Sequence, residues 1–177
     1  MKPAVFLDRD GVINRSIVRN GRPYPPQRLE DLEILPGVQE ALERLKAAGF
    51  ATVVVTNQPD VARGRQTREV VEAMHARLAA LLSLDEFRVC YHDDPDVCAC
   101  RKPMPGLLTQ TPVYDLARSV MVGDRWRDVE AGRRAGCRAT ILIDYDYTED
   151  EHAARPDVRF CSLAESVDWI LATMVSA

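Results

Sequence analysis

The apolar residues of this chain fall into short uninterrupted runs, separated by longer stretches in which they recur every three or four positions. Uninterrupted runs of four or five residues suit strands that are buried on both faces of a parallel sheet. Such runs occupy residues 4–7, 51–55, 119–122 and 139–143. Helical spacing covers residues 38–48, 67–82 and 128–135. This alternation predicts an α/β fold in which a doubly wound parallel sheet forms the middle of three layers.

The ends of the expected helices carry capping signals. Thr67 is a good N-cap for the second helix, and Ser162 with Glu165 forms a capping box that opens a last helix. Residues 106–116 also have a helical pattern, which Pro112 must break or kink.

Two further strands and a loop complete the expected order of elements. Phe87, Val89 and Tyr91 alternate with other residues in the pattern of a strand. Residues 158–161 predict an edge strand, and the polar residues 145–156 predict a surface loop.

The irregular segment after the first strand contains Asn20-Gly21, a strong signal for a tight hairpin turn. We expect a small two-stranded flap there, folded over the carboxyl end of the sheet. Pro23, Pro25 and Pro26 follow, and we expect them to exclude regular structure. Only about twenty residues separate this flap from the first helix, too few for a separate cap domain.

Composition narrows the class of protein. A chain of 177 residues, 46% apolar and 28% charged, fits a single globular domain over residues 1–177. The formal net charge of −4 argues against nucleic acid as a partner. No apolar run is long enough to cross a membrane, and the first residues lack the pattern of a signal peptide. The five cysteines do not suit a disulfide framework, so we expect a metal site in a protein of the reducing cytoplasm. We also expect the protein to be a monomer.

Polar residues follow the predicted strands where each strand ends. Asp8 and Asp10 come directly after the first strand, and residues two apart on an extended chain point the same way. A solvated acidic turn would need no partners, but the carboxyl ends of parallel strands share one edge of the sheet, where later residues join these two. Asp128 either supports a metal or caps its own helix. The partners at this edge are Thr56, Asn57, Lys102, Asp124 and Asp128.

A hydroxyl, a lysine and several carboxylates at one edge indicate phosphoryl transfer to a carboxylate. Asp8 is the expected nucleophile, which forms an aspartyl-phosphate, and Asp10 the expected general acid and base. Mg²⁺ prefers oxygen ligands, so Asp8, Asp124 and the backbone carbonyl of Asp10 are its expected ligands. Thr56 and backbone N–H groups would hold the phosphoryl oxygens, and Lys102 would neutralise developing charge.

A second motif, C-x-H-x5-C-x-C, indicates a zinc site. Three thiols and one imidazole can close a tetrahedron around Zn²⁺ with no open position, which is typical of a structural site. The alternative is a loop of unpaired thiols. Cys137 and Cys161 lie beside apolar strand residues and are expected in the core. The expected zinc ligands are Cys90, His92, Cys98 and Cys100.

Taken together, the strand-end motifs resemble those of the haloacid dehalogenase superfamily of phosphatases. The resemblance spans residues 4–144 and implies a Rossmann-like fold and magnesium-dependent hydrolysis of a small phosphorylated metabolite. The matching motifs, in order, are D-x-D-G from Asp8 to Gly11, Thr56-Asn57-Gln58, Lys102, and G-D-x-x-x-D from Gly123 to Asp128.

The zinc loop resembles that of the capless branch formed by heptose-1,7-bisphosphate phosphatases and histidinol-phosphatases. Residues 56–64 and 98–108 look more like the heptose enzymes. The resemblance implies removal of the 7-phosphate of D-glycero-D-manno-heptose 1,7-bisphosphate, with histidinol phosphate or another sugar or nucleic-acid-end phosphate as the alternative. Two alternatives are not enzymes of this kind. A receiver-type signalling domain would carry its phosphoacceptor after a middle strand, whereas here D-x-D-G follows the first strand. A catalytically silent binding module would lack at least one charged motif residue, and here all are present.

A bisphosphate needs cations for the phosphate that does not react. Arg63 lies seven residues after Thr56, and Arg101 immediately precedes Lys102. We therefore expect both guanidinium groups to reach the rim of the site. The alternative is that both are surface arginines without a ligand. Asn57 would hydrogen-bond a sugar hydroxyl or the flap backbone.

Overall fold

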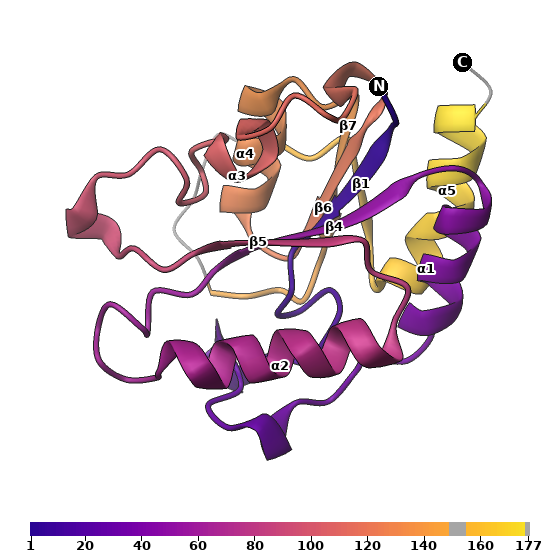
Figure 1. Cartoon of the computed structure of the whole chain (residues 1–177). Helices are drawn as coiled ribbons and strands as arrows, with labels where there is room; N and C mark the ends of the chain where they lie inside the picture. The colour runs from indigo at the N-terminus through magenta and orange to yellow at the C-terminus, as the bar shows by residue number, and fades with distance from the viewer. Residues whose placement is uncertain (149–154, 176–177) are drawn as a thin grey trace.

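A six-stranded, all-parallel sheet forms the centre of the computed structural model, which describes residues 1–148 and 155–175 (Figure 1). The strand order is β5-β4-β1-β6-β7-β8, so the chain builds outward from β1 in one direction and then in the other. Open sheets with this order bind ligands at the carboxyl ends of the strands where the direction changes. The strands are β1 (Ala4–Leu7), β4 (Ala51–Asn57), β5 (Glu86–Cys90), β6 (Val120–Gly123), β7 (Ala139–Ile143) and β8 (Val158–Phe160).

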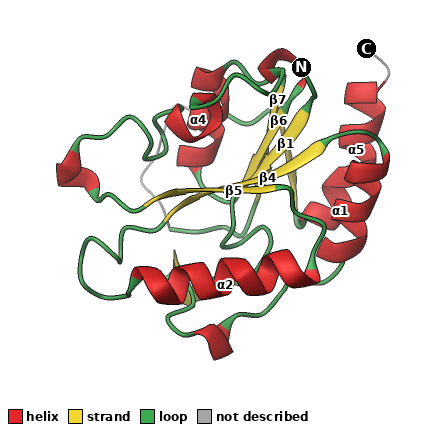
Figure 2. Ribbon diagram, in the orientation of Figure 1, coloured by secondary structure: helices red, strands yellow, loops and turns green. Residues whose placement is uncertain are grey.

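Helices cover both faces of the sheet, which confirms the predicted three-layer α/β fold (Figures 1 and 2). One face packs against α1, α2 and α5, and the other against α3 and α4. Short 3₁₀ turns lie at Leu29–Asp31, Asp94–Asp96 and Leu116–Arg118. The helices are α1 (Val38–Ala47), α2 (Arg68–Leu81), α3 (Gly106–Thr109), α4 (Trp126–Ala135) and α5 (Leu163–Val175).

The β1 strand shows why its four residues are all apolar. Val5 and Leu7 pack into the core beneath α1 and α5, whereas Ala4 and Phe6 pack into the core beneath α3 and α4. All four side chains are fully buried. Because successive side chains of a strand point to opposite faces, a central strand covered on both sides needs apolar residues at every position.

The predicted caps are confirmed by hydrogen bonds. The Thr67 hydroxyl accepts a hydrogen bond from the backbone N–H of Val70 at the start of α2. At α5 the Ser162 hydroxyl accepts from the N–H of Glu165, and the Glu165 carboxylate accepts from the N–H of Cys161. These bonds satisfy N–H groups that have no partner within the helix.

The helix expected over residues 106–116 is wrong, because α3 ends at Thr109. Continuing it would require Pro112 to donate to the Leu108 carbonyl, and proline has no N–H. The carbonyls of Leu107 and Leu108 instead accept hydrogen bonds from the guanidinium of Arg88, at 2.9 and 3.2 Å.

The expected strand is confirmed as β5, and it buries a charged residue, Arg88. The Arg88 side chain is buried together with that of Cys90, while Phe87 and Val89 are only partly buried, and Phe87 packs against the core. The Arg88 guanidinium donates to Glu86 on the same strand and to the α3 carbonyls, so this buried charge has hydrogen-bond partners.

The predicted flap is confirmed as the antiparallel pair β2 (Ile17–Arg19) and β3 (Arg22–Tyr24). Asn20 and Gly21 both have positive φ, 51° and 72°, as a type I′ turn requires. The expectation that Pro23 excludes regular structure is wrong, since Pro23 pairs with Val18 in the flap. Both strands of a two-stranded sheet are edges, where a missing N–H is tolerated.

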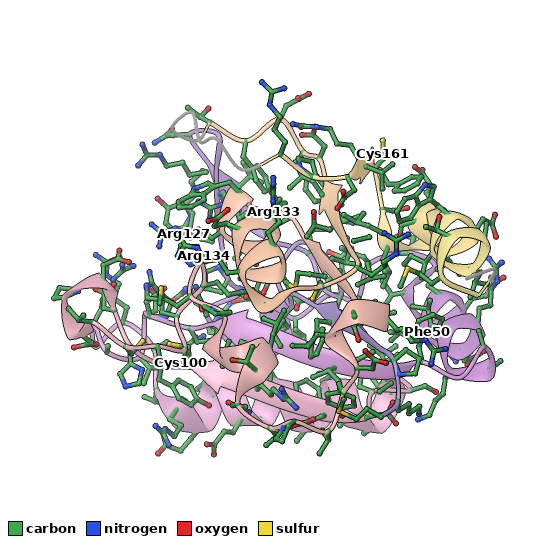
Figure 3. All side chains as sticks on the ribbon, turned by 90° about the horizontal axis from the view of Figure 1, so that it is seen from above. Phe50, Cys100, Arg127, Arg133, Arg134 and Cys161 are labelled. Atoms are coloured by element: carbon green, nitrogen blue, oxygen red, sulfur yellow. The ribbon has the colours of Figure 1, made fainter. Side chains whose placement is uncertain are left out.

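Two smaller expectations also fail. Leu81 belongs to the apolar spacing that predicts a helix over residues 67–82, which places it on the inward face, but it is 52% exposed. Cys161 is exposed at the surface rather than in the core (Figure 3). Of the predicted loop over 145–156, residues 149–154 lie outside the described part of the chain. Among the described helices, none combines the length and apolar composition that crossing a bilayer needs.

Candidate active site

A cavity of about 360 Å³ opens at the carboxyl ends of the central strands. Its floor comes from the ends of β1, β4 and β6, and the flap forms one side of it. Asp8, Asp10, Asn57, Asp124, Pro23 and Tyr24 are among the residues that line it. The structure therefore brings together residues that the sequence places at three separate strand ends.

Lys102 connects two of the carboxylates on the floor. Its ammonium lies 2.9 Å from Asp8 Oδ1 and 2.6 Å from Asp128 Oδ1, and it donates to the backbone carbonyl of Val55 at 2.8 Å. Burial alone lowers the pKa of Lys102, but the charges of Asp128 and Asp8 raise it above its ordinary value. Lys102 is therefore a fixed positive charge beside the expected nucleophile.

Three buried carboxylates crowd this floor. One oxygen each of Asp8, Asp124 and Asp128 lies within 4.8 Å of the others. Burial, opposed by Lys102, raises the pKa of Asp8 to about 6, and burial with the charge of Asp8 raises the pKa of Asp124 well above its ordinary range. Hard oxygen ligands that repel one another fit a divalent cation such as Mg²⁺, whose charge offsets the repulsion.

Asp128 caps its own helix, one of the two roles that the sequence left open, and it also contacts Lys102. Its Oδ1 contacts the Lys102 ammonium, and its Oδ2 accepts a hydrogen bond from the backbone N–H of Arg125 at the start of α4, at 3.0 Å. Both oxygens are occupied by these contacts. Asp8 and Asp124 are therefore better placed than Asp128 to bind a metal directly.

The two motif glycines make room for these carboxylates. A Cβ atom on Gly11, whose φ is +87°, would lie 2.1 Å from Asp124 Oδ2, and one on Gly123 would lie 2.1 Å from Asp128 Cβ. Real Cβ contacts are never that short. The glycines of D-x-D-G and G-D-x-x-x-D thus let the backbone approach Asp124 and Asp128.

Asp10 lies beside this group, and four donor atoms hold its carboxylate. Arg9 donates from Nε and Nη2, Asn14 Nδ2 donates to Oδ1 at 2.9 Å, and Gln58 Nε2 donates to Oδ2 at 2.8 Å. Gln58 Nε2 also donates to the Thr56 hydroxyl at 3.0 Å. No role for Arg9, Asn14 or Gln58 was predicted from the sequence, although Arg9 and Gln58 lie inside the matched motifs.

Asn57 contacts the backbone of Lys102, a contact that was not predicted from the sequence. Its amide Nδ2 donates to the carbonyl of Lys102, and its Oδ1 accepts from the Lys102 N–H, both at 3.1 Å. The amide therefore fixes the backbone that carries Lys102, rather than the flap backbone. This pairing leaves one amide N–H for any sugar hydroxyl in the cavity.

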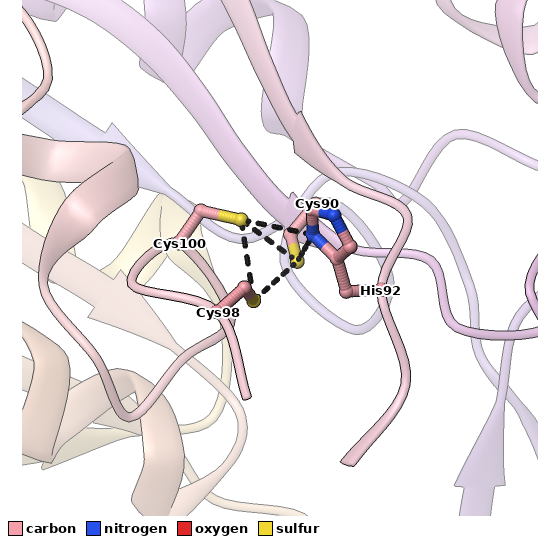
Figure 4. Close-up of side chains that lie close together, drawn as sticks. All are labelled: Cys90, His92, Cys98 and Cys100. Carbon is pink, nitrogen blue, oxygen red and sulfur yellow. Dashed lines mark hydrogen bonds between the residues drawn. The ribbon is translucent and has the colours of Figure 1, made fainter. Parts of the chain in front are cut away.

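The four predicted zinc ligands form a tight cluster at the end of β5 (Figure 4). Their Sγ–Sγ distances are 3.2–3.7 Å, and the His92 Nδ1 lies 3.5 and 3.3 Å from the sulfurs of Cys90 and Cys100. A tetrahedral zinc site has sulfur atoms roughly 3.7 Å apart. Burial raises the pKa of Cys98, but hydrogen bonds, first that from the Arg101 N–H, bring it down to about 7, which favours the thiolate that a metal needs.

Three of the five arginines that line the cavity contact the zinc loop, and we call them the rim arginines: Arg63, Arg101 and Arg127. Each of them contacts a carboxylate of that loop. Asp93 accepts two hydrogen bonds from Arg63, at 2.7 and 2.5 Å, and Asp94 accepts from Arg101 at 2.8 Å and from Arg127 at 3.2 Å. Arg127, which α4 carries beside the zinc loop, was not predicted from the sequence (Figure 3).

Residues 14–136 match the family of haloacid dehalogenase-like hydrolases. The chain belongs to that family. The fold and the strand-end motifs agree with this membership, and the predicted superfamily is confirmed. The D-x-D-G motif precedes the matched range, but curated relatives align with almost the whole chain.

Among these hydrolases, the similar curated proteins are phosphatases. D-glycero-D-manno-heptose-1,7-bisphosphate 7-phosphatase of Thermosynechococcus vestitus is 36% identical, over 96% of this chain and 95% of its own length. The Escherichia coli K12 protein named D-glycero-beta-D-manno-heptose-1,7-bisphosphate 7-phosphatase is 37% identical, over 80% of this chain and 78% of its own. The prediction of a haloacid dehalogenase-type phosphatase is confirmed.

A solved structure of the same family shares the architecture. D,D-heptose 1,7-bisphosphate phosphatase from B. bronchiseptica, complexed with magnesium and phosphate, aligns with a TM-score of 0.78 and 29% identity. The alignment covers 97% of this chain and 99% of that chain. The expected use of a metal ion agrees with this neighbour and with the carboxylate cluster.

Proposed function

We propose that this hydrolase removes the 7-phosphate of D-glycero-D-manno-heptose 1,7-bisphosphate through an aspartyl-phosphate, as a single capless domain that acts as a monomer in the cytoplasm. The observation that carries the chemistry is the placement of Lys102 between Asp8 and Asp128, with Asp124 beside them, on the floor of the cavity. The relatives named above support the choice of substrate.

In the first step, Asp8 attacks the phosphorus atom, and the bond from phosphorus to the sugar oxygen breaks. Asp10 gives its proton to the departing oxygen, so that an alcohol leaves rather than an alkoxide. Lys102 offsets charge that develops on the phosphoryl oxygens, and the Thr56 hydroxyl donates to one of them. Asp8, Asp124 and the backbone carbonyl of Asp10 would hold a Mg²⁺ ion, whose positive charge would offset the repulsion between the Asp8 carboxylate and the phosphate.

In the second step, Asp10 accepts a proton from a water molecule, which attacks the phosphorus atom. The bond to Asp8 breaks, and inorganic phosphate and the free carboxylate are released. Asp10 thereby returns to its protonated state for the next cycle. One residue serves as acid and then as base because the sugar oxygen leaves, and the water later attacks, on the same side of the phosphorus atom.

The second metal is structural in this proposal. Cys90, His92, Cys98 and Cys100 hold one Zn²⁺ and leave no open position for a substrate. Lys102 follows Cys100 by two residues, and the zinc loop also carries the carboxylates that contact the rim arginines. The zinc therefore braces both the lysine and one wall of the cavity.

The substrate is tested by measuring phosphate release in Mg²⁺ from heptose 1,7-bisphosphate, heptose 7-phosphate and histidinol phosphate. We expect the highest kcat/KM for the bisphosphate and no turnover in EDTA. Faster turnover of histidinol phosphate than of the bisphosphate would contradict the substrate but leave the chemistry in place. Activity that survives removal of Mg²⁺ would contradict the chemistry itself.

The rim arginines give a sharper test of where the second phosphate binds. For Arg101→Ala we expect KM for the bisphosphate to rise about tenfold or more, because a charge-assisted contact to the second phosphate is lost. KM for heptose 7-phosphate, which has no second phosphate, should change little. Arg44→Ala is the matched control, since Arg44 pairs with Asp168 on the helical face away from the cavity. Equal increases for both substrates would place the second phosphate elsewhere.

A further inference from the structure

His75 is a buried, titratable residue that the proposed reaction does not use. It lies on α2, is 8% exposed, and does not line the cavity. Its ring stacks on Phe87 of β5, with the ring centroids 4.9 Å apart and the planes inclined by 27°. The sheet therefore fixes the plane of the imidazole from beneath.

The polar edge of this ring faces Arg9, the residue between the two motif aspartates. His75 Nε2 lies 3.1 Å from Arg9 Nη1. A guanidinium can only donate, so Nε2 must be the unprotonated acceptor, and the ring is neutral with its proton on Nδ1. Burial and the charge of Arg9 lower the pKa of His75 to about 4, in keeping with a neutral acceptor at physiological pH.

Arg9 transmits this contact to Asp10. Its side chain is fully buried, and its Nε and Nη2 atoms contact the Asp10 carboxylate at 3.0–3.2 Å. The guanidinium is rigid and planar, so fixing Nη1 also fixes the direction of the edge that holds the carboxylate. The chain of contacts runs from Phe87 through His75 and Arg9 to Asp10.

We propose that His75 is a positioning residue for the general acid: it fixes the Arg9 guanidinium, which in turn holds the Asp10 carboxylate in the orientation that delivers a proton to the leaving oxygen. This inference rests on the proposed function for the role of Asp10. Without the imidazole, Arg9 has a buried donor with no acceptor and turns toward another. Asp10 shares two contacts with that guanidinium and turns with it, and small displacements of a reacting group cost much of the rate.

The test compares His75→Phe with His75→Gln on two phosphate esters. Phenylalanine keeps the stacking on Phe87 but offers no acceptor, whereas glutamine offers its Oε1 in place of Nε2. Sugar phosphate has a poor leaving group that needs a proton, and p-nitrophenyl phosphate releases a phenolate that does not. For His75→Phe we expect kcat/KM for the sugar phosphate to fall at least about tenfold, with kcat/KM for p-nitrophenyl phosphate within about twofold. We compare kcat/KM because it reports the steps up to departure of the leaving group and excludes the later attack of water, in which Asp10 acts as base for both esters. His75→Gln should recover most of the loss.

Asp10→Asn is the reference for the leaving-group effect. If Asp10→Asn lowers kcat/KM equally for both esters, the general-acid role proposed for Asp10 is contradicted. If Asp10→Asn discriminates between the esters but His75→Phe does not, the positioning role of His75 is overturned and the residue only fills space. Melting temperatures show whether each variant folds. If the larger ring of His75→Phe prevents folding, His75→Leu takes its place as the variant without an acceptor.

Discussion

Phosphate release by the Asp8→Asn variant is expected to fall by about 10⁴-fold or more, because the amide cannot attack phosphorus and no covalent intermediate forms. Asparagine keeps the size of the side chain, and its amide oxygen can still accept from the Lys102 ammonium. The fold should therefore persist while turnover is lost. Single-turnover assays with labelled phosphate, quenched in acid, should trap label on the wild-type protein and none on the variant.

Two controls make this result specific. Asp168→Asn changes an exposed aspartate that pairs with Arg44, and its kcat should match that of the wild type. The Asp8→Asn protein should melt at a temperature near that of the wild type. Near-normal turnover by folded Asp8→Asn protein would rule out a covalent mechanism at this residue.

Removal of one cluster thiol should produce the second large effect. Protein purified without chelator should carry about one zinc per chain, and Cys98→Ser should lose it, because a serine hydroxyl is a poor zinc ligand at neutral pH. Ligand loss of this kind costs several kcal/mol, which corresponds to a melting temperature lower by roughly 10 °C for a chain of this size. Activity should fall in parallel, since Lys102 lies two residues beyond the cluster.

Elemental analysis and thermal melts measure both effects. Cys161→Ser is the matched control, because Cys161 is exposed and lies outside the cluster. Wild-type protein that contains no zinc, or a Cys98→Ser protein that melts normally, would contradict a structural metal at this position.

The predictions that succeeded depend on signals that lie close together in the sequence. The apolar run before Asp8, the Asn20-Gly21 turn and the Thr67 cap each specify their structure within a few residues. The four residues of the cysteine–histidine cluster also lie close together in the sequence, so the spacing from Cys90 to Cys100 predicts that they meet. The three-layer arrangement with a parallel sheet follows from the alternation of strands with helices.

The contacts that were not predicted from the sequence join polar groups whose partners are distant in the chain. Arg88 is buried because carbonyls some twenty residues later accept its hydrogen bonds, and no pattern within β5 reveals that. Gln58 reaches Asp10 across 48 positions, and Asn57 reaches Lys102 across 45. Such contacts depend on how neighbouring strands align, which periodicity does not determine.

The carboxylates of Asp93 and Asp94 change how an anion reaches the rim arginines. Three guanidinium groups without counterions would attract any polyanion over a long range, and salt would weaken that attraction strongly. Here each guanidinium already contacts a carboxylate of the zinc loop. A phosphate that binds the rim arginines would have to displace those carboxylates, and we expect this exchange to favour an anion able to contact several arginines at once.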